Sequence, residues 1–466
     1  MRELSRHVAE TYLEQRQHLE FPWLKEADKT VVRGAAVDKA VSGRAAQRPV
    51  VLAASDLLFE IGTEELPASD LQSALDQLKE RVTPLLDELR LAHGAVRVLG
   101  TPRRLVVVIK ELAAAQPDRT SLVKGQPASR AFDAMGLPTK AAEGFAKSRG
   151  IEVKALQVRE IDGGSYAVAE IQESGRPAVE VLAEALPKLV AALRFDRPMR
   201  WNASNVAFSR PIRWLLALLG GQVVPFEYAG LSSGRKTRGL RCMAPAEMEV
   251  SHLQDYFSFL AGQGILVDPA ERRQIISEQV THLMAEAGGT PKIDDALLDE
   301  VYQLVEAPTA LRGQFDEAYL LLPPEVLISV MKKHQRYFPV QALSGRLLPN
   351  FIAVRNGDRQ HLDTVADGNE QVIRARYADA AFFIDQDLKH ANLDDFLPRL
   401  GTLMFQTKLG SMLDKSQRIT RLVEPLLPLL SAEEDEAVIT RRAAVLCKAD
   451  LVSHMVIEMT SLQGSM

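Results

Sequence analysis

A chain of 466 residues is too long to fold around one hydrophobic core. Single cores stop growing at about 250–300 residues, and longer chains divide into domains of about 100–200 residues each. We therefore expect several domains. The longest apolar stretches, Trp214–Leu219 and Leu105–Ile109, fall far short of the roughly 20 residues that a bilayer-spanning helix needs, so the sequence predicts no membrane span.

Composition narrows the class of protein further. Hydrophobic residues make up 46% of the chain and charged residues 25%, which is typical of globular proteins and excludes disordered and collagen-like chains. The beginning of the chain carries charges of both signs and no apolar segment of a secretory signal, so we expect a cytoplasmic location. Cys242 and Cys447 show no zinc-type spacing, so we predict neither a disulfide framework nor a zinc site.

The residues before position 56 differ from the rest of the chain. Residues 2–21 carry apolar side chains at helical spacing, and Pro22 ends that pattern. Residues 25–55 show no sustained periodicity, and we interpret them as a linker.

A strand, a helix and a hairpin are predicted next. Leu57–Ile61 is an apolar strand, and the segment after it places leucines and valines on one face of a helix. The apolar runs Val96–Leu99 and Leu105–Ile109 are separated by a short segment with a glycine and a proline, which is typical of a hairpin. We expect Arg103 and Arg104 to be exposed on its turn.

The remaining pattern predicts an α+β, multidomain fold. A second hairpin is expected at Asp162–Gly164 and a helix at Ala178–Leu193, and helical periodicity returns between Asp268 and Val305. From Asp394 onward helical periodicity dominates. We expect two α+β regions followed by an incomplete all-helical region, at residues 56–245, 246–393 and 394–466 respectively.

The net charge of −5 argues against a nucleic-acid partner, but the charge is unevenly distributed. Between Arg194 and Arg241 there are nine Lys and Arg and only two acidic residues, a local net of +7. These cations cannot all be paired within the segment, which favours an RNA-backbone surface, while a solvated face is the alternative. Trp201 and Trp214 lie in the same segment, and we expect both to pack in a core rather than to stack on bases.

A second basic cluster, Lys332–Arg336, follows the apolar run Val326–Met331. Its side chains are expected at the surface, where they either contact phosphate or are simply solvated; both alternatives stay open. His334 lies inside the cluster without a nearby carboxylate in the sequence, so we do not predict a general base there.

The common catalytic motifs are missing from the sequence. Gly230–Thr237 resembles a phosphate loop, but its glycines are one residue too close and Arg235 precedes the lysine, so we interpret it as a basic loop. Glu60, Glu64 and Glu65 could form a metal or acid–base cluster, but negative charge just before a helix is favourable in itself. We therefore predict no catalytic residue and no metal ligand.

Several longer motifs carry a family resemblance. They are FEIGTEELP at 59–67, GTPRRL at 100–105, PTKAAEGF at 138–145, MRWN at 199–202, FSRPIRW at 208–214, KHQRYF at 333–338 and RARYADAAFF at 374–383. Over Leu57–Met466 the chain resembles the β subunit of bacterial glycyl-tRNA synthetase. VAETYLEQRQHLEFPWL at 8–24 resembles the carboxyl end of the α subunit, so the chain is similar to the fused α-β form and residues 1–24 are expected to be the terminal helix of an α-like part.

This resemblance implies a class II aminoacyl-tRNA synthetase. ATP and glycine would form glycyl-adenylate, and glycine would pass to tRNA(Gly), with magnesium assisting. In this family the adenylate site lies in the α part, so the chain is expected to be inactive alone and to hold no cofactor itself. The implied partners are tRNA(Gly) and the α catalytic part, in an α2β2-type assembly or a dimer of the fused chain. The expected location is the cytoplasm, or the plastid if the source is a plant.

The resemblance also assigns roles to regions. Residues 56–245 would handle tRNA, and 394–466 would be similar to an HD-type domain that precedes an anticodon-binding region. Lys448, Ala449 and Asp450 stand where a metal-binding His-Asp pair is expected, and His454 is the nearest histidine. We therefore interpret this region as a scaffold rather than a metal-dependent phosphohydrolase.

The leading hypothesis is a tRNA-binding portion of the ligase, and the alternative is an assembly module that docks the α part with little tRNA contact. The candidate tRNA-binding residues are Arg103, Arg104, Arg200, Arg210, Arg213, Arg235, Lys236, Arg238, Lys332, Lys333 and Arg336.

Overall fold

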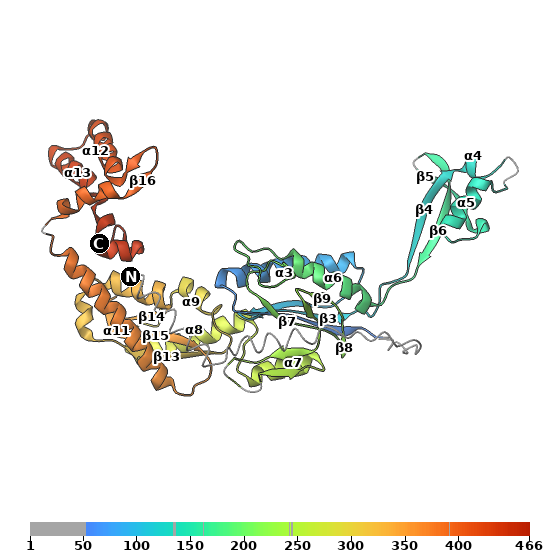
Figure 1. Ribbon diagram of the computed structural model, residues 1–466, viewed down its shortest axis with the longest axis horizontal. Helices are drawn as coiled ribbons and strands as arrows, with labels where there is room; N and C mark the ends of the chain where they lie inside the picture. The colour runs from blue at the N-terminus through green and yellow to red at the C-terminus, as the bar shows by residue number, and fades with distance from the viewer. Residues whose placement is uncertain (1–52, 134–136, 162, 242, 244–245, 391) are drawn as a thin grey trace, which may run out of the picture. The chain divides into compact units, whose positions relative to one another are not determined.

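The structure is a computed structural model that describes residues 53–133, 137–161, 163–241, 243, 246–390 and 392–466 (Figure 1). The helix predicted at 2–21 lies outside the described residues, and so does the predicted linker up to residue 52. Both assignments stay predictions.

The first sheet has five antiparallel strands in the order β2-β3-β1-β7-β8. Its central strand β1 is the predicted apolar strand, and β2 and β3 form the predicted hairpin. Buried apolar side chains occupy both faces of the central strands, so the sheet is covered on both sides. The strands are β1 (Ser55–Thr63), β2 (Val96–Thr101), β3 (Arg104–Leu112), β7 (Ile212–Leu219) and β8 (Gln222–Val223).

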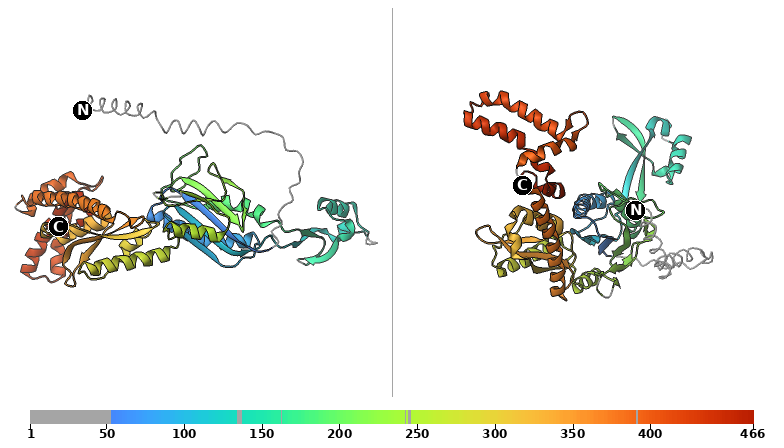
Figure 2. Two further views of the ribbon diagram at one scale, coloured as in Figure 1. Left: turned by 90° about the horizontal axis from the view of Figure 1, so that it is seen from below. Right: turned by 60° about the vertical axis from the view of Figure 1, so that its left-hand side comes forward.

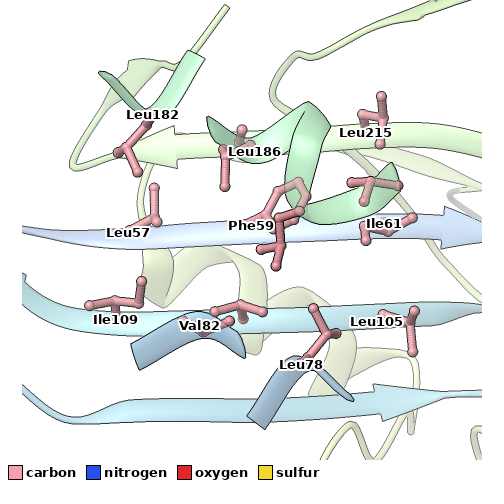
Figure 3. Close-up of a cluster of buried hydrophobic side chains, with 14 of the residues drawn as sticks. Leu57, Phe59, Ile61, Leu78, Val82, Leu105, Ile109, Leu182, Leu186 and Leu215 are labelled. Atoms are coloured by element: carbon pink, nitrogen blue, oxygen red, sulfur yellow. The ribbon is translucent and has the colours of Figure 1, made fainter. Parts of the chain in front are cut away.

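Alternate side chains of this sheet pack into two separate cores. Leu57, Phe59 and Ile61 of β1 contact α3 and α6, which cover the same face (Figures 1 and 3). Leu58 packs with α7 on the opposite face. Glu60 is on the same face as Leu58 by strand alternation and is fully buried, so this second face is not purely apolar. The helices are α3 (Ala68–Glu88), α6 (Ala178–Ala192) and α7 (Leu253–Gly262).

A segment inserted between β3 and α6 forms a small sheet of its own, in the order β4-β6-β5. β5 and β6 pair antiparallel around Gly163, which confirms the second predicted hairpin. Its core consists largely of alanines, including Ala142, Ala146 and Ala167. The elements are β4 (Arg119–Pro127), α4 (Ala128–Ala131), α5 (Lys140–Ser148), η1 (Val153–Ala155), β5 (Gln157–Ile161) and β6 (Gly164–Glu173).

Two short two-stranded ladders lie between β8 and α7 in the chain, β9 with β10 and β11 with β12. The phosphate-loop-like segment Gly230–Thr237 runs through β10 and into β11. No helix follows it directly in the described chain, whereas a phosphate loop leads into a helix amino end. The strands are β9 (Glu227–Tyr228), β10 (Leu231–Ser232), β11 (Lys236–Arg238) and β12 (Glu247–Glu249).

The second sheet has three antiparallel strands in the order β13-β15-β14, with helices on both faces. α8 and α9 supply one core, and α10 and α11 supply the other. The predicted helical segment between Asp268 and Val305 is thereby confirmed. The elements are α8 (Pro269–Glu286), α9 (Asp295–Val301), β13 (Pro308–Gln314), η2 (Glu317–Leu321), α10 (Pro324–Ser329), the π-helix η3 (Val330–Gln335), β14 (Phe338–Gln341), β15 (Leu347–Asn356) and α11 (Leu362–Asp387).

The last segment is mostly helical, and α12 and α13 lie side by side (Figures 1 and 2). The expectation of an all-helical region was wrong in one detail, because β16 and β17 form a short hairpin. Met455 and Met459 pack with Tyr377 of α11, so the end of the segment belongs to the core of the second sheet. The elements are η4 (Leu393–Thr402), β16 (Met404–Gln406), β17 (Gly410–Ser411), α12 (Met412–Leu429), α13 (Glu434–Leu446), η5 (Ala449–Val452), α14 (His454–Glu458) and η6 (Thr460–Leu462).

The mixture of helices and small antiparallel sheets confirms the α+β, multidomain class. The predicted region boundaries stay predictions, as does the HD-like assignment. His454 Nδ1 lies 2.8 Å from a carboxylate oxygen of Asp387, and Asp450 accepts a hydrogen bond from the Gly464 amide. His454 and Asp450 therefore stabilise the local structure through these contacts.

Candidate nucleic-acid interface

The two arginines of the β2-β3 hairpin are buried, so the prediction that they are exposed was wrong. The Arg103 side chain is 8% exposed and that of Arg104 is fully buried. Strand pairing continues as far as Thr101 and Arg104, which leaves a turn of only two residues. The Gly239 backbone oxygen accepts a hydrogen bond from Arg103. Two carboxylates from distant parts of the chain supply the partners that make this burial tolerable.

Arg104 lies between two buried carboxylates. Its Nη1 is 3.3 Å from Glu60 Oε1, and its Nε is 3.0 Å from Glu306 Oε1. Its Nη2 donates a hydrogen bond of 3.0 Å to the backbone oxygen of Arg238. Glu306 also accepts hydrogen bonds from Thr101 at 2.6 Å and from Arg103 at 3.4 Å. We call Glu60, Arg103, Arg104 and Glu306 the buried ion network.

Two aromatic residues complete the shell around Glu60. Tyr256 donates its hydroxyl to Glu60 Oε1 at 3.0 Å, and Trp214 donates its indole N–H to Oε2 at 3.0 Å. A Cβ at Gly62 would lie 1.9 Å from the Trp214 ring, so only glycine leaves room for the indole. Trp214 is 7% exposed, which confirms that it packs in the core. Trp201 is partly buried against the core of α3 and α6, which confirms the same prediction.

The protonation equilibria follow from this packing. Burial alone would raise the pKa of Glu306, but the charge of Arg104, the hydrogen bond from Thr101 and the charge of Arg103 outweigh it, so the pKa of Glu306 lies below its ordinary value. Burial and the neighbouring Glu60 raise the pKa of Tyr256 well above its ordinary value, so its hydroxyl keeps its proton and can donate. Glu306 is therefore a carboxylate at neutral pH, and Tyr256 is a neutral phenol.

Arg213 reaches the surface through an irregularity in the sheet. Gly62 pairs with Trp214 but Thr63 pairs with Ile212, so Arg213 is an extra residue in β7. It is exposed while both of its neighbours are buried. Its Nε lies 3.3 Å from Glu64, which also pairs with Arg241.

A cavity of about 350 Å³ lies where these elements meet. The end of β1, the β2-β3 turn, the start of β7 and the β11-β12 ladder all contribute to it. Its lining residues are Thr63, Glu64, Arg103, Arg213, Arg238, Gly239, Leu240, Arg241, Ala246 and Glu247. We call this the arginine cavity.

Three arginines of the basic segment find acidic partners outside the segment. Arg213 and Arg241 pair with Glu64, and Arg238 lies 3.1 Å from Glu247. The local charge count missed Glu64 because it lies far away in the sequence, and it missed Glu247 because that residue lies just beyond the segment. Glu64 and Glu65 precede α3 as expected, and both lie within ion-pair distance of arginines.

The other predicted residues of this segment are spread over the surface. Arg200 is exposed and donates to the Asn205 backbone oxygen at 3.2 Å, and the half-buried Arg210 donates to the Ser209 backbone oxygen at 2.8 Å. Arg235 donates to the Gly221 backbone oxygen at 3.2 Å. Lys236 is exposed and forms no ion pair with any described residue.

The second basic cluster is at the surface as predicted, in the π-helix η3 and at its end. Lys332 pairs with Asp294, and Arg336 lies 2.9 Å from Glu300, so both have partners in or beside α9. Lys333 is exposed and is in no ion pair with a described residue. Burial and the charges of nearby cations lower the pKa of His334, which is consistent with the lack of a carboxylate beside it.

Sequence reasoning missed Thr63 and Glu306 as parts of this site. Glu306 had a signal that could have found it, because it is the single charged residue between Val301 and Leu311. A single charge in such a stretch indicates a buried ion pair. Thr63 had no comparable signal.

The described residues contain no group of three or more His, Cys, Asp or Glu side chains that could hold a metal ion. Among the described helices, none combines the length and the apolar character that crossing a membrane requires.

We predict that Glu306→Gln lowers the free energy of unfolding by about 3–5 kcal/mol, because it leaves a buried guanidinium short of one charge. Since the folded-state pKa of Glu306 is lowered, its stabilisation is present above about pH 4.5 and is lost as the pH falls through the folded-state value. Urea unfolding at pH 7 and at pH 3.5 measures both effects. The control is Glu249→Gln on the exposed side of β12, with an expected change within about 0.5 kcal/mol. An equal effect of the two substitutions would contradict the prediction.

Known proteins are similar to this chain over most of its length. Residues 57–466 match the family model described as glycyl-tRNA synthetase beta subunit. The glycine–tRNA ligase beta subunit of Desulforamulus reducens is 47% identical over 413 residues, which cover 89% of this chain and 59% of that protein. The corresponding subunit of Moorella thermoacetica gives the same identity and coverage. The chloroplastic/mitochondrial glycine–tRNA ligase 2 of Arabidopsis thaliana is 42% identical over 469 aligned positions, which cover all of this chain and 43% of that protein.

The chain thus spans about three fifths of the length of these bacterial relatives. The matched motifs hold the residues that build the site: Glu60 and Gly62 in the first motif, Arg103 and Arg104 in the second, and Trp214 in FSRPIRW. The chain therefore belongs to the glycyl-tRNA synthetase β subunit family.

Proposed function

We propose that this chain is the tRNA-binding β portion of a glycine–tRNA ligase, which joins glycine to tRNA(Gly) with the conversion of ATP to AMP and diphosphate. The single observation that carries the tRNA-binding role is the convergence of arginines from four strands and turns around one surface cavity. Phosphate contacts by Lys and Arg dominate the affinity of proteins for RNA and DNA backbones.

The structure changes which residues we assign to this role. Arg103 and Arg104 are too deeply buried to meet a duplex backbone, so their proposed part is to hold the surface in place. Among the candidate residues, Lys236 and Lys333 are exposed lysines in no ion pair with a described residue, which makes them available phosphate ligands. We propose that further phosphate contacts come from the other candidates of each basic cluster. With Lys236 these are Arg200, Arg210, Arg213, Arg235 and Arg238, and with Lys333 they are Lys332 and Arg336.

The catalytic chemistry is proposed to belong to an α catalytic part. ATP and magnesium would bind there, and this chain alone would not aminoacylate tRNA. The Arabidopsis protein aligns along the whole of this chain, whereas the bacterial β subunits align over 89% of it. That difference supports the fused α-β form, in a dimer of the fused chain or an α2β2-type assembly. The name of the Arabidopsis relative also supports a plastid location as an alternative to the cytoplasm.

We predict that the chain binds tRNA(Gly) with an affinity that falls steeply with salt. The double substitution Arg235→Gln with Lys236→Gln should weaken binding and lower the slope of log affinity against log salt by about 1 for each phosphate that the variant no longer neutralises. Fluorescence titrations at 50 and 200 mM salt measure this. Lys79→Gln, which removes an exposed cation from α3, is the control and should leave the slope unchanged. An affinity for tRNA(Gly) that does not change with salt concentration would contradict the proposal.

A second function, docking of the α catalytic part, is favoured by exposed apolar side chains in the last segment. Leu422, Leu426 and Leu429 follow one another at helical spacing on α12, and Leu429 is 78% exposed. Val438 and Ile439 of α13 are more than half exposed. Apolar side chains gathered on two neighbouring helices mark a protein interface more often than a free surface.

We expect Leu429→Asp to reduce co-purification of the chain with a separately produced α part, because the charge would be buried in the interface. Leu321→Asp is the matched control, since Leu321 is 92% exposed and lies in η2, outside α12 and α13. If both variants retain the α part equally, α12 is not the docking surface.

A further inference from the structure

The arginine cavity has the dimensions of a small-ligand site. Its volume of about 350 Å³ is at the lower end of the range for such pockets. Duplex RNA cannot enter a space of this size, whereas one phosphate with the sugar attached to it can. The cavity therefore fits a small phosphate-bearing ligand, whereas the surface around it would contact the phosphates of an RNA backbone.

The charge of the lining is positive. Four arginines line the cavity, but only two carboxylates, Glu64 and Glu247, do so. Glu65 lies 3.7 Å from Arg241 without lining the cavity, and Glu306 reaches Arg103 at 3.4 Å but is shared with Arg104. The lining residues alone carry a formal charge of +2, but Glu60, Glu65 and Glu306 balance it together with Arg104. The match to a phosphate dianion therefore lies in the guanidinium N–H donors.

Two lining residues have buried polar atoms without a hydrogen-bond partner in the described chain. They are Thr63 Oγ1 and Arg103 Nε. Both residues are more than nine-tenths buried. Such groups are costly when left unsatisfied, and a ligand with several acceptor oxygens would satisfy them.

The guanidinium groups are held in position before any ligand arrives. Arg103 donates to the Gly239 backbone oxygen and to Glu306. Arg238 lies over the Trp214 ring, with 5.3 Å between the guanidinium carbon and the ring centroid. Arg213 is directed outward by the extra residue in β7. Preorganised donors of this kind lower the entropic cost of binding.

We propose that the arginine cavity binds a phosphate monoester through Arg103, Arg213, Arg238 and Arg241, with the Thr63 hydroxyl as a further ligand. The phosphate could come from the end of an RNA chain or from a free nucleotide, and both present the same dianion. Only the RNA source rests on the proposed tRNA-binding function.

The test is isothermal titration of the 466-residue chain with inorganic phosphate and with AMP, with adenosine as the uncharged control. Saturable binding of one equivalent of phosphate or AMP, without binding of adenosine, is expected. Arg213→Gln and Arg241→Gln should each weaken binding about tenfold or more, because each removes a charged hydrogen-bond donor. Both side chains are about half exposed, so these substitutions should leave the fold intact. Arg346→Gln, in the exposed turn between β14 and β15, should leave the affinity unchanged.

The source of the phosphate is identified by comparing tRNA that keeps its 5′-phosphate with the same tRNA after phosphatase treatment. Competition by the phosphorylated RNA alone assigns the cavity to an RNA end, and equal competition by both RNAs assigns it to a free nucleotide. No saturable binding of phosphate or AMP, or equal affinity in all three variants, would overturn the proposal. If tRNA still binds with salt dependence in that case, the cavity inference fails while the proposed function stands.

Discussion

The ion pairs of Arg104 with Glu60 and Glu306 are the constraint on which the rest of this structure depends. A guanidinium with no solvent exposure must have its charge and its donors satisfied by the protein, and here two carboxylates and a backbone oxygen do so. Glu60 comes from the central strand of the first sheet, and Glu306 comes just before the first strand of the second. Arg104 also donates to the Arg238 backbone oxygen, and the adjacent Arg103 donates to the Gly239 backbone oxygen, so the β2-β3 turn holds the backbone from which the arginine cavity is built.

Much of the fold could be predicted from the sequence because its signals are local. The apolar runs of β1 and β3, the turn residues of the hairpins and the helical spacing in α3 and α6 depend on neighbours within a few residues. The partners of the arginines could not be predicted in the same way. Arg104 and Glu306 are 202 residues apart, and periodicity does not indicate which distant carboxylate will reach a given guanidinium. Arg103 and Arg104 were therefore predicted at the surface, where a turn residue normally lies.

The structure divides the basic residues into two groups, buried and exposed, that a count of charges along the sequence cannot distinguish. Buried arginines hold the backbone at the surface, and exposed cations such as Lys236 are proposed to contact an external phosphate. The chain belongs to the glycyl-tRNA synthetase β subunit family and spans about three fifths of the length of its bacterial relatives, and its own contribution is proposed as recognition rather than adenylate chemistry. The arginine cavity, proposed as a phosphate site, is lined by the buried Arg103 together with Arg213, Arg238 and Arg241.

A double-mutant cycle between Arg104→Met and Glu306→Gln tests the central claim most directly. Each single substitution leaves a buried charge short of its partner, whereas the double substitution removes both members of the pair. The account predicts that the double variant is more stable than the sum of the single effects by about 1–3 kcal/mol in urea unfolding. Effects that add to within about 0.5 kcal/mol would show that the two residues do not act as one unit, and would contradict the account.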